Sequence, residues 1–301
     1  MYKLTHKQHY VPKFYMKQWI DESGQGEVLR EKIQYLENAE GAFSTKGPSG
    51  ICYKDDIYEI GKLRGQYVCP NMLEEEYGRL ESRLAPVIRQ IVSKIDINDS
   101  DALVLSTEEK EAVIELAANM ITRNKYYIEA MRRDCSDPEV RKLEEADKSG
   151  LVALMQNTET VLQMSPEYRK CNNIPESSNV VGGYADADAK RFLREEKYIT
   201  ILRNKDGAFL FSDNPVICYK RFVCLPISPC IAIVFVDNQS GCPRNRITDI
   251  SAEDAMRLNA EYAYLYRKKR CELICGANTQ TGRRAMEQFQ KDLRMIASTA
   301  R

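Results

Sequence analysis

Residues 5–16 read Thr-His-Lys-Gln-His-Tyr-Val-Pro-Lys-Phe-Tyr-Met and are the stretch from which the fold is best read. Both histidines of the chain, His6 and His9, lie here, and the only tryptophan, Trp19, follows within ten residues of His9. So many large rings favour a segment that enters the core. Any mechanism that needs an imidazole base or ligand must use one of these two histidines.

A second polar stretch, Ser212-Asp213-Asn214-Pro215-Val216, follows a predicted strand. Together with residues 8–15, it resembles the bacterial family known as domain of unknown function 4238. Members begin with a segment like QHYVPxFY and carry SDNPV after a strand; this chain has Trp19 where the family usually has Phe. The resemblance spans roughly positions 8 to 260 and implies no established activity. Its weaker matches are Asp56-Ile57-Tyr58, Leu80-Glu81, Arg123 and Leu258-Asn259.

The charge balance gives no general attraction to nucleic acid or to an anionic membrane, because Lys+Arg and Asp+Glu number 44 each. Short basic clusters at 267–270 and 283–284 are more typical of solvated helix faces, so nucleic-acid binding has only weak support. No apolar run reaches the roughly 18 residues of a membrane span, and the first residues lack the apolar region of a signal peptide. We therefore expect a cytoplasmic protein without a membrane partner.

The ten cysteines do not form a recognisable framework, since the sequence contains no C-x-x-C pair. Several lie in apolar, strand-like runs, where a free thiol behaves as a small hydrophobic side chain. Free thiols in a reducing compartment fit this distribution better than disulfides or a structural zinc site.

Hydrophobic periodicity predicts helices in the middle of the chain and at its end. The apolar residues between 73 and 92 recur at spacings of three and four, with Pro86 as the expected kink site. Ser106 or Thr107 is expected to cap a helix that extends toward residue 133. Further helices are predicted at 137–164, 185–196, 251–265 and 283–297.

Strands are predicted at 198–202, 208–212, 216–219 and 231–236, with a hairpin turn at 205–207 joining the first two. The fold class is therefore α+β, with a helix-rich middle packed on a C-terminal, mainly antiparallel sheet. At 301 residues the chain fits a single domain. A subdivision into 1–164 and 185–301, joined by a linker at 165–184, is the alternative.

The candidate catalytic residues are His9, Glu81, Arg123 and Asp213. Each also has a structural interpretation: His9 as a buried anchor, Asp213 in an Asx-type turn, Glu81 and Arg123 as charges at the edge of a helix face. Sites on sheets often hold acids where a strand ends, because the carboxylate there is rigid yet reachable. The candidate binding residues are Gln8, Tyr10, Ser212, Asn214 and Asn259.

If the four candidate catalytic residues converge, they supply two carboxylates, an imidazole and a guanidinium. This set suits hydrolysis, either with a divalent metal on the acids or with a carboxylate base and an arginine that binds phosphate. Nucleotide-cofactor, P-loop, kinase and serine-hydrolase motifs are absent from the sequence. The first hypothesis is a hydrolase-like enzyme acting on a phosphate-containing or nucleic-acid substrate. The alternative is a non-catalytic binding or interaction protein in which both motifs stabilise the fold.

Overall fold

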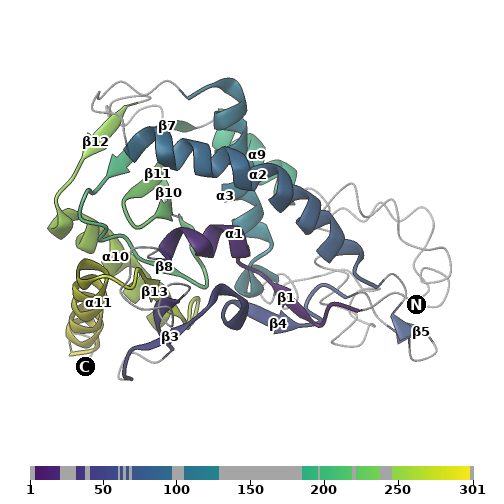
Figure 1. Ribbon diagram of the computed structural model, residues 1–301, viewed down its shortest axis with the longest axis horizontal. Coiled ribbons are helices and arrows are strands. Elements are labelled where there is room, and N and C mark those ends of the chain that lie inside the picture. Colours follow the sequence, from purple (N-terminus) through teal and green to yellow (C-terminus); the bar gives the residue numbers. More distant parts are fainter. Residues whose placement is uncertain are drawn as a thin grey trace.

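A five-stranded sheet with the order β12-β7-β11-β10-β9 forms the centre of the protein (Figure 1). Its strands are antiparallel except β12, which runs parallel to β7. The strands are β7 (Lys197–Arg203), β9 (Ile217–Cys218), β10 (Phe222–Ser228), β11 (Ile231–Asp237) and β12 (Ile247–Asp249). The computed structural model describes residues 4–20, 32–37, 41–59, 62–63, 66–67, 70–96, 105–128, 185–195, 197–218, 222–237 and 246–298.

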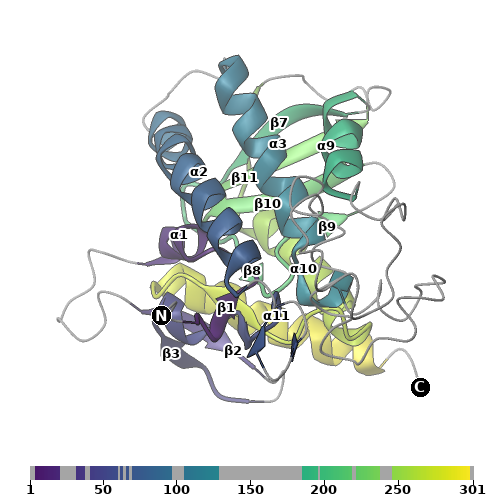
Figure 2. The same cartoon turned by 90° about the vertical axis from the view of Figure 1, so that its right-hand side faces the viewer.

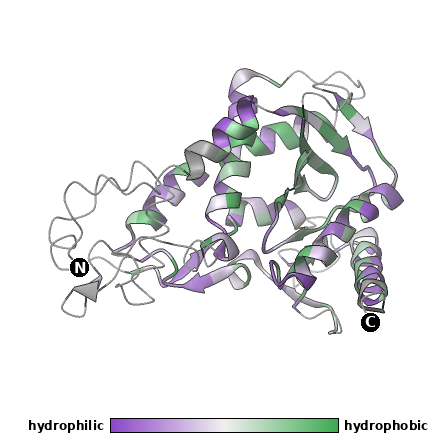
Figure 3. Cartoon of the chain, turned by 180° about the vertical axis from the view of Figure 1, so that it is seen from behind, coloured by the Kyte–Doolittle hydropathy of each residue, from purple (hydrophilic) through white to green (hydrophobic). Residues whose placement is uncertain are grey.

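Helices cover both faces of this sheet, so its central strands are buried on both sides. Alternate side chains of β11 illustrate this: Ile233 and Phe235 belong to one hydrophobic cluster with α2 and α3, and Val234 and Val236 to another with α10 and α11. Figure 2 shows α2 and α3 side by side, and Figure 3 shows the hydrophobic residues gathered on the strands. The helices are α2 (Met72–Asp96), α3 (Thr107–Thr122), α9 (Ala185–Glu195), α10 (Ala252–Arg267) and α11 (Gln280–Ser298).

Of the three smaller sheets in the described residues, the four-stranded one joins the N-terminal part of the chain to the C-terminal part, and the two-stranded ones lie within the N-terminal part. The four-stranded sheet has the order β3-β2-β13-β8, and β1 pairs with β4 in an antiparallel ribbon. Strands β5 and β6 form a further pair. The bounds are β1 (Lys7–His9), β2 (Ile33–Leu36), β3 (Ser44–Lys46), β4 (Tyr53–Asp55), β5 (Lys62–Leu63), β6 (Gln66–Tyr67), β8 (Phe211–Ser212) and β13 (Ile274–Gly276), with a 3-10 turn η2 at Pro48–Gly50.

The aromatic N-terminal segment lies inside the core as α1 (Lys13–Met16) and η1 (Lys17–Trp19). The Tyr15 hydroxyl donates to the Pro226 carbonyl at 2.6 Å, and Trp19 Nε1 donates to the Phe209 carbonyl at 3.2 Å. The Trp19 ring lies 4.6 Å from that of Phe211. A buried indole or phenol needs such a partner, since an unpaired polar group in the core is costly. The segment is therefore fixed to β10 of the central sheet by Tyr15 and to residues 209–211, which lead into β8, by Trp19.

The predicted α+β class is confirmed, and the predicted helices within the described residues are found close to their expected bounds. Ser251 caps α10 by accepting from the backbone N–H of Asp254. α3 ends at Thr122, but residues 125–128 are helical again, and the expected end near residue 133 lies outside the described residues. The predicted helix at 137–164 and the linker at 165–184 lie outside the described residues.

The predicted hairpin at 205–207 is wrong. β7 pairs with β11 and β12, whereas β8 belongs to the other sheet and pairs with β13. The turn itself exists, with Gly207 at φ 74°, a left-handed conformation that glycine adopts without steric cost. The chain therefore uses this turn to pass from one sheet to another, and turn chemistry alone does not reveal that difference.

Ser106 forms a capping box at the start of α3, and its removal should have a measurable cost. Its hydroxyl accepts from the Glu109 backbone N–H at 3.1 Å, and the Glu109 carboxylate accepts from the Ser106 N–H at 2.7 Å. We expect Ser106→Ala to lower the free energy of unfolding by about 1 kcal/mol in urea denaturation. Ser82→Ala, which removes an exposed hydroxyl bonded within α2, is the matched control and should change little. Equal effects of the two substitutions would contradict the capping role.

Candidate functional site

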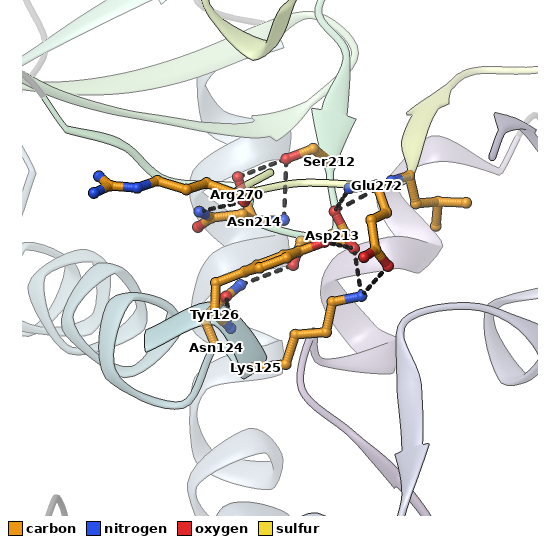
Figure 4. Close-up of polar contacts among 9 residues, drawn as sticks. Asn124, Lys125, Tyr126, Ser212, Asp213, Asn214, Arg270 and Glu272 are labelled. Atoms are coloured by element: carbon orange, nitrogen blue, oxygen red, sulfur yellow. Dashed lines mark hydrogen bonds and ion pairs between the residues drawn. The ribbon is translucent and has the colours of Figure 1, made fainter. Parts of the chain in front are cut away.

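Asp213 is a buried carboxylate surrounded by hydrogen-bond donors at the end of β8 (Figure 4). Its Oδ1 accepts from the backbone N–H of Glu272 at 3.0 Å and of Leu273 at 3.3 Å. Its Oδ2 accepts from the Tyr126 hydroxyl at 2.8 Å and pairs with Lys125 Nζ at 3.1 Å. Burial raises the pKa of Asp213, while Lys125, the Glu272 backbone and Tyr126 act in the opposite direction. The two oxygens thus have four donors, which fills the acceptor capacity of a carboxylate.

Two of these four contacts, those of Lys125 and Tyr126, come from residues that follow α3, and Asn124 adds a contact to the Asp213 main chain. Arg123 caps the helix, and the chain then turns so that Asn124 Nδ2 donates to the Asp213 carbonyl at 2.8 Å. Asn124 Oδ1 in turn accepts from the Tyr126 backbone N–H at 2.9 Å, which fixes the turn. Our sequence reasoning missed Asn124, Lys125 and Tyr126. The sequence pattern places them inside the helix expected to extend toward residue 133, so it gives no signal of a site there.

A pocket of about 410 Å³ opens beside this cluster. Tyr10 from the N-terminal motif and Asp213 from the SDNPV motif both line it. Lys125 lies between them, because its Nζ pairs with Asp213 and lies 5.3 Å from the centre of the Tyr10 ring. The two motifs therefore meet at one cavity. Its lining residues are Tyr10, Glu37, Lys46, Gly50, Ile51, Cys52, Tyr53, Lys125, Asp213, Glu272 and Leu273.

The two lysines of the pocket carry their charge in ion pairs. Lys125, with its side chain 14% exposed, pairs with Asp213 and, at 2.8 Å, with Glu272. Burial alone lowers the pKa of Lys125, but these two carboxylates outweigh it and the net shift is upward. Lys46 pairs with Glu37 at 3.5 Å, and contacts headed by the Tyr35 side chain raise its pKa. Both ammonium groups are therefore protonated at neutral pH.

Arg123 is the centre of a second buried cluster. Its guanidinium, 1% exposed, pairs with Glu81 at 2.9 Å and lies 4.4 Å from the centre of the Tyr77 ring. Its Nη2 donates to the His9 carbonyl. The Arg123 carbonyl accepts from the Tyr58 hydroxyl at 3.0 Å, so both ends of this residue are held. Arg123 thus ties α3 to α2 and to β1.

His9 is buried, with 4% of its surface exposed, and its ring packs beside Tyr53 at 5.7 Å. Within the described residues, neither ring nitrogen has a hydrogen-bond partner. Burial, with smaller contributions from Lys13 and Arg123, lowers the pKa of His9 to about 4, and the nearby backbone of Pro48 and Ser49 acts in the opposite direction. The imidazole is therefore neutral at physiological pH, and it is not among the side chains that line the pocket.

The four predicted catalytic residues thus fall into two clusters. Glu81 and Arg123 form an ion pair, and Arg123 reaches His9 only through the His9 backbone. Among the contacts of the described residues, none joins the Asp213 side chain to that of His9, Glu81 or Arg123. The short segment from Arg123 to Tyr126 connects the two clusters.

Gln8, predicted as a binding residue, lies fully buried between two parts of the chain. Its Oε1 accepts from the Tyr58 backbone N–H at 2.7 Å, and its Nε2 donates to Glu59 at 2.5 Å. Burial raises the pKa of Glu59, while the Asn71 backbone and Gln8 partly offset it. The polar groups of the Gln8 amide are thus engaged in holding β1 against residues 58–59.

The remaining predicted binding residues contact the main chain. Ser212 Oγ accepts from the Asn214 backbone N–H at 3.0 Å, and Asn214 Nδ2 donates to the Arg270 carbonyl at 2.9 Å. The Asn259 side chain bonds the backbone of residues 208–210 at both its amide atoms. Of the five, only Tyr10 lines the pocket.

The described part of the chain contains no cluster of three or more His, Cys, Asp or Glu side chains arranged to hold a metal ion. Cys52 lines the pocket, but burial raises the pKa of its thiol well above the ordinary value, so it stays protonated. A protonated, buried thiol is a poor nucleophile. Cys52 also has φ 54°, an uncommon left-handed conformation for a residue with a side chain.

The fold and the site define an α+β protein in which an aromatic N-terminal motif and an SDNPV motif meet at a polar pocket. The chain belongs to the family described as protein of unknown function (DUF4238), whose model matches residues 7–266. Comparisons with curated proteins and with solved structures found no match. Among the described helices, none has the length and apolar character that crossing a membrane requires.

Proposed function

We propose that this protein binds a small molecule carrying an anionic group in the pocket between its two motifs, and that binding rather than hydrolysis is its task. One observation carries the proposal: Tyr10 and Asp213, from motifs that are 203 positions apart in the chain (213 minus 10), line one pocket with Lys125 between them. Its volume of about 410 Å³ is in the range of ordinary ligand sites.

The lysines favour an anionic group in the ligand. An ammonium is a compact charge with three donors, and lysine is a frequent phosphate binder in proteins. Among the described residues, Lys125 donates to the buried Asp213 and to Glu272, whose side chain is 70% exposed and can give way to a ligand. Within the described part of the chain, Lys46 has a long contact of 3.5 Å to Glu37 and a contact with Tyr35. Both ammonium groups thus have donor capacity toward the pocket.

The hydrolase hypothesis has weaker support from the same contacts. A general base needs a free acceptor within reach of the substrate. Asp213 already accepts from four donors, and His9 is buried outside the pocket lining. Arg123, which was expected to hold phosphate, is 1% exposed and bonded to Glu81 and the His9 carbonyl. These residues are engaged in interactions that stabilise the fold.

Isothermal titration calorimetry with inorganic phosphate and with nucleoside monophosphates tests the proposal, with uncharged nucleosides as comparison ligands. We expect the anions alone to bind, and Lys125→Met to weaken them by roughly ten- to hundredfold, the contribution of a hydrogen bond to a charged group. Lys190→Met is the matched control, since Lys190 is a partly buried, ion-paired lysine on α9, remote from the pocket lining. It should leave binding unchanged.

Because Lys125→Met leaves Asp213 without its cation, Lys46→Met provides a second variant with little expected cost to folding. Its side chain is 45% exposed. We expect it also to weaken phosphate binding. Absence of anion binding by the wild-type protein, or wild-type affinity in both lysine variants, would contradict the proposal. Steady release of phosphate from a phosphate monoester, lost in Asp213→Asn, would restore the hydrolase hypothesis.

A further inference from the structure

Lys125 has two carboxylate partners that differ sharply in burial. The Asp213 side chain is 1% exposed, whereas that of Glu272 is 70% exposed. Asp213 has three further donors, two backbone N–H groups and the Tyr126 hydroxyl. Within the described part of the chain, the Glu272 carboxylate has Lys125 as its only polar partner. Asp213 is therefore the permanent partner of Lys125, and Glu272 is the partner that a ligand can replace.

The Glu272 side chain is able to leave Lys125 without disturbing the fold. Its backbone is fixed, because its N–H donates to Asp213 Oδ1 at 3.0 Å and the next residues lead into β13. Water solvates the exposed Glu272 carboxylate once it leaves, and the buried Lys125 ammonium keeps its pair with Asp213. Rotation of the Glu272 side chain into solvent is therefore an inexpensive change.

We propose that the Glu272 carboxylate occupies the ligand position on Lys125 and is displaced by the anionic group of the ligand, a dianionic phosphate monoester. This inference rests on the proposed function of the pocket. A carboxylate carries one negative charge, whereas a phosphate monoester carries about −1.5 to −2 at pH 7 and three acceptor oxygens. Replacing Glu272 on Lys125 is therefore favourable for a phosphate monoester. A ligand with a single carboxylate gains little, because it replaces a group of the same charge. Glu272 thus determines specificity for the more highly charged anion.

The other lysine of the pocket shows the same arrangement. Lys46 pairs with Glu37 at 3.5 Å, and the two side chains are 45% and 65% exposed. Both residues line the pocket together with Lys125 and Glu272. Each ammonium that faces the pocket therefore has an exposed glutamate that a ligand can replace.

The test compares phosphate and acetate binding to the full-length wild-type protein, Glu272→Gln and Glu272→Asp. We expect Glu272→Gln to bind inorganic phosphate about fivefold more tightly, which is the upper end of what an exposed ion pair contributes. Glu272→Asp keeps the charge but shortens the side chain, so it should tighten binding to a similar degree. We also expect the Gln variant to gain affinity for acetate, because the competing carboxylate is gone.

A matched control is Glu111→Gln, which removes an exposed, arginine-paired carboxylate of α3 far from the pocket lining. It should leave binding unchanged. Wild-type affinity in Glu272→Asp, with tightening only in the Gln variant, would mean that Glu272 acts through its charge alone and would overturn the displacement. Weaker binding in the Gln variant would overturn it too, since Glu272 would then assist the ligand. If neither the wild-type protein nor any variant binds phosphate, the proposed function itself is overturned.

Discussion

Replacing Arg123 with methionine is expected to lower the free energy of unfolding by about 3–5 kcal/mol, the usual cost of removing one partner of a buried ion pair. The guanidinium is 1% exposed and pairs with Glu81 at 2.9 Å. It also donates to the His9 carbonyl and lies against the Tyr77 ring. Methionine fills much of the space but offers no donor, so Glu81 and the His9 carbonyl both lose their partner. Urea denaturation measures the loss.

The matched control is Arg83→Met on α2. Arg83 also pairs with a glutamate, Glu115, at 2.7 Å, but its side chain is 61% exposed. Exposed pairs contribute roughly 0–1 kcal/mol, so this substitution should have a small effect. A loss in Arg123→Met no larger than that in Arg83→Met would show that Arg123 is not a structural centre, and its predicted role in binding phosphate would regain support.

The fold class and the helices were predictable because their signals are local. Ser106 and Ser251 cap α3 and α10, with acidic residues in each first turn, as the sequence indicates. The strand β11 was predictable as a continuous apolar run. Such features depend on residues within one or two turns of the chain.

Pairing between distant segments was not predictable from these local signals. The turn at Gly207 has the chemistry of a hairpin, yet β8 pairs with β13, which lies more than 60 residues away. Strand β10 contains Pro226 and was not predicted as a strand. Proline cannot donate to a ladder, but register irregularity near Pro226 and Ser228 accommodates it. Which strands pair is decided by the packing of the whole core, and local sequence patterns do not reveal that packing.

The candidate site was predictable in part. The sequence singled out Tyr10 and Asp213, and both line the pocket. It did not single out Lys125, whose role depends on contacts with residues 88 and 147 positions further along the chain (213 and 272 minus 125). A lysine within a predicted helix has the appearance of an ordinary surface residue, and only the tertiary fold brings two carboxylates to it.

Acid should weaken the wild-type protein through His9, and His9→Phe should remove that part of the pH dependence. The folded state keeps the imidazole neutral, with a pKa of about 4 in place of 6.5, chiefly because of burial. Between these values the unfolded chain takes up a proton that the folded chain refuses. Stability therefore falls as the pH drops from 6.5 toward 4, by about 1.4 kcal/mol per pH unit from this group. Phenylalanine does not titrate and lacks the unpartnered nitrogens.

Urea denaturation at pH 7 and at pH 5 measures this effect as the difference between wild type and His9→Phe. Subtraction removes the contributions of carboxyl groups such as Glu59 and Glu74, whose pKa values burial raises. We expect the wild type to lose about 2 kcal/mol more than the variant, since pH 5 lies 1.5 units below 6.5. Tyr53→Phe, a change in the ring that packs on His9, should keep the wild-type dependence. Parallel stability profiles for wild type and His9→Phe would mean that the folded protein does protonate His9, which would favour an imidazole able to exchange protons and thus the catalytic interpretation.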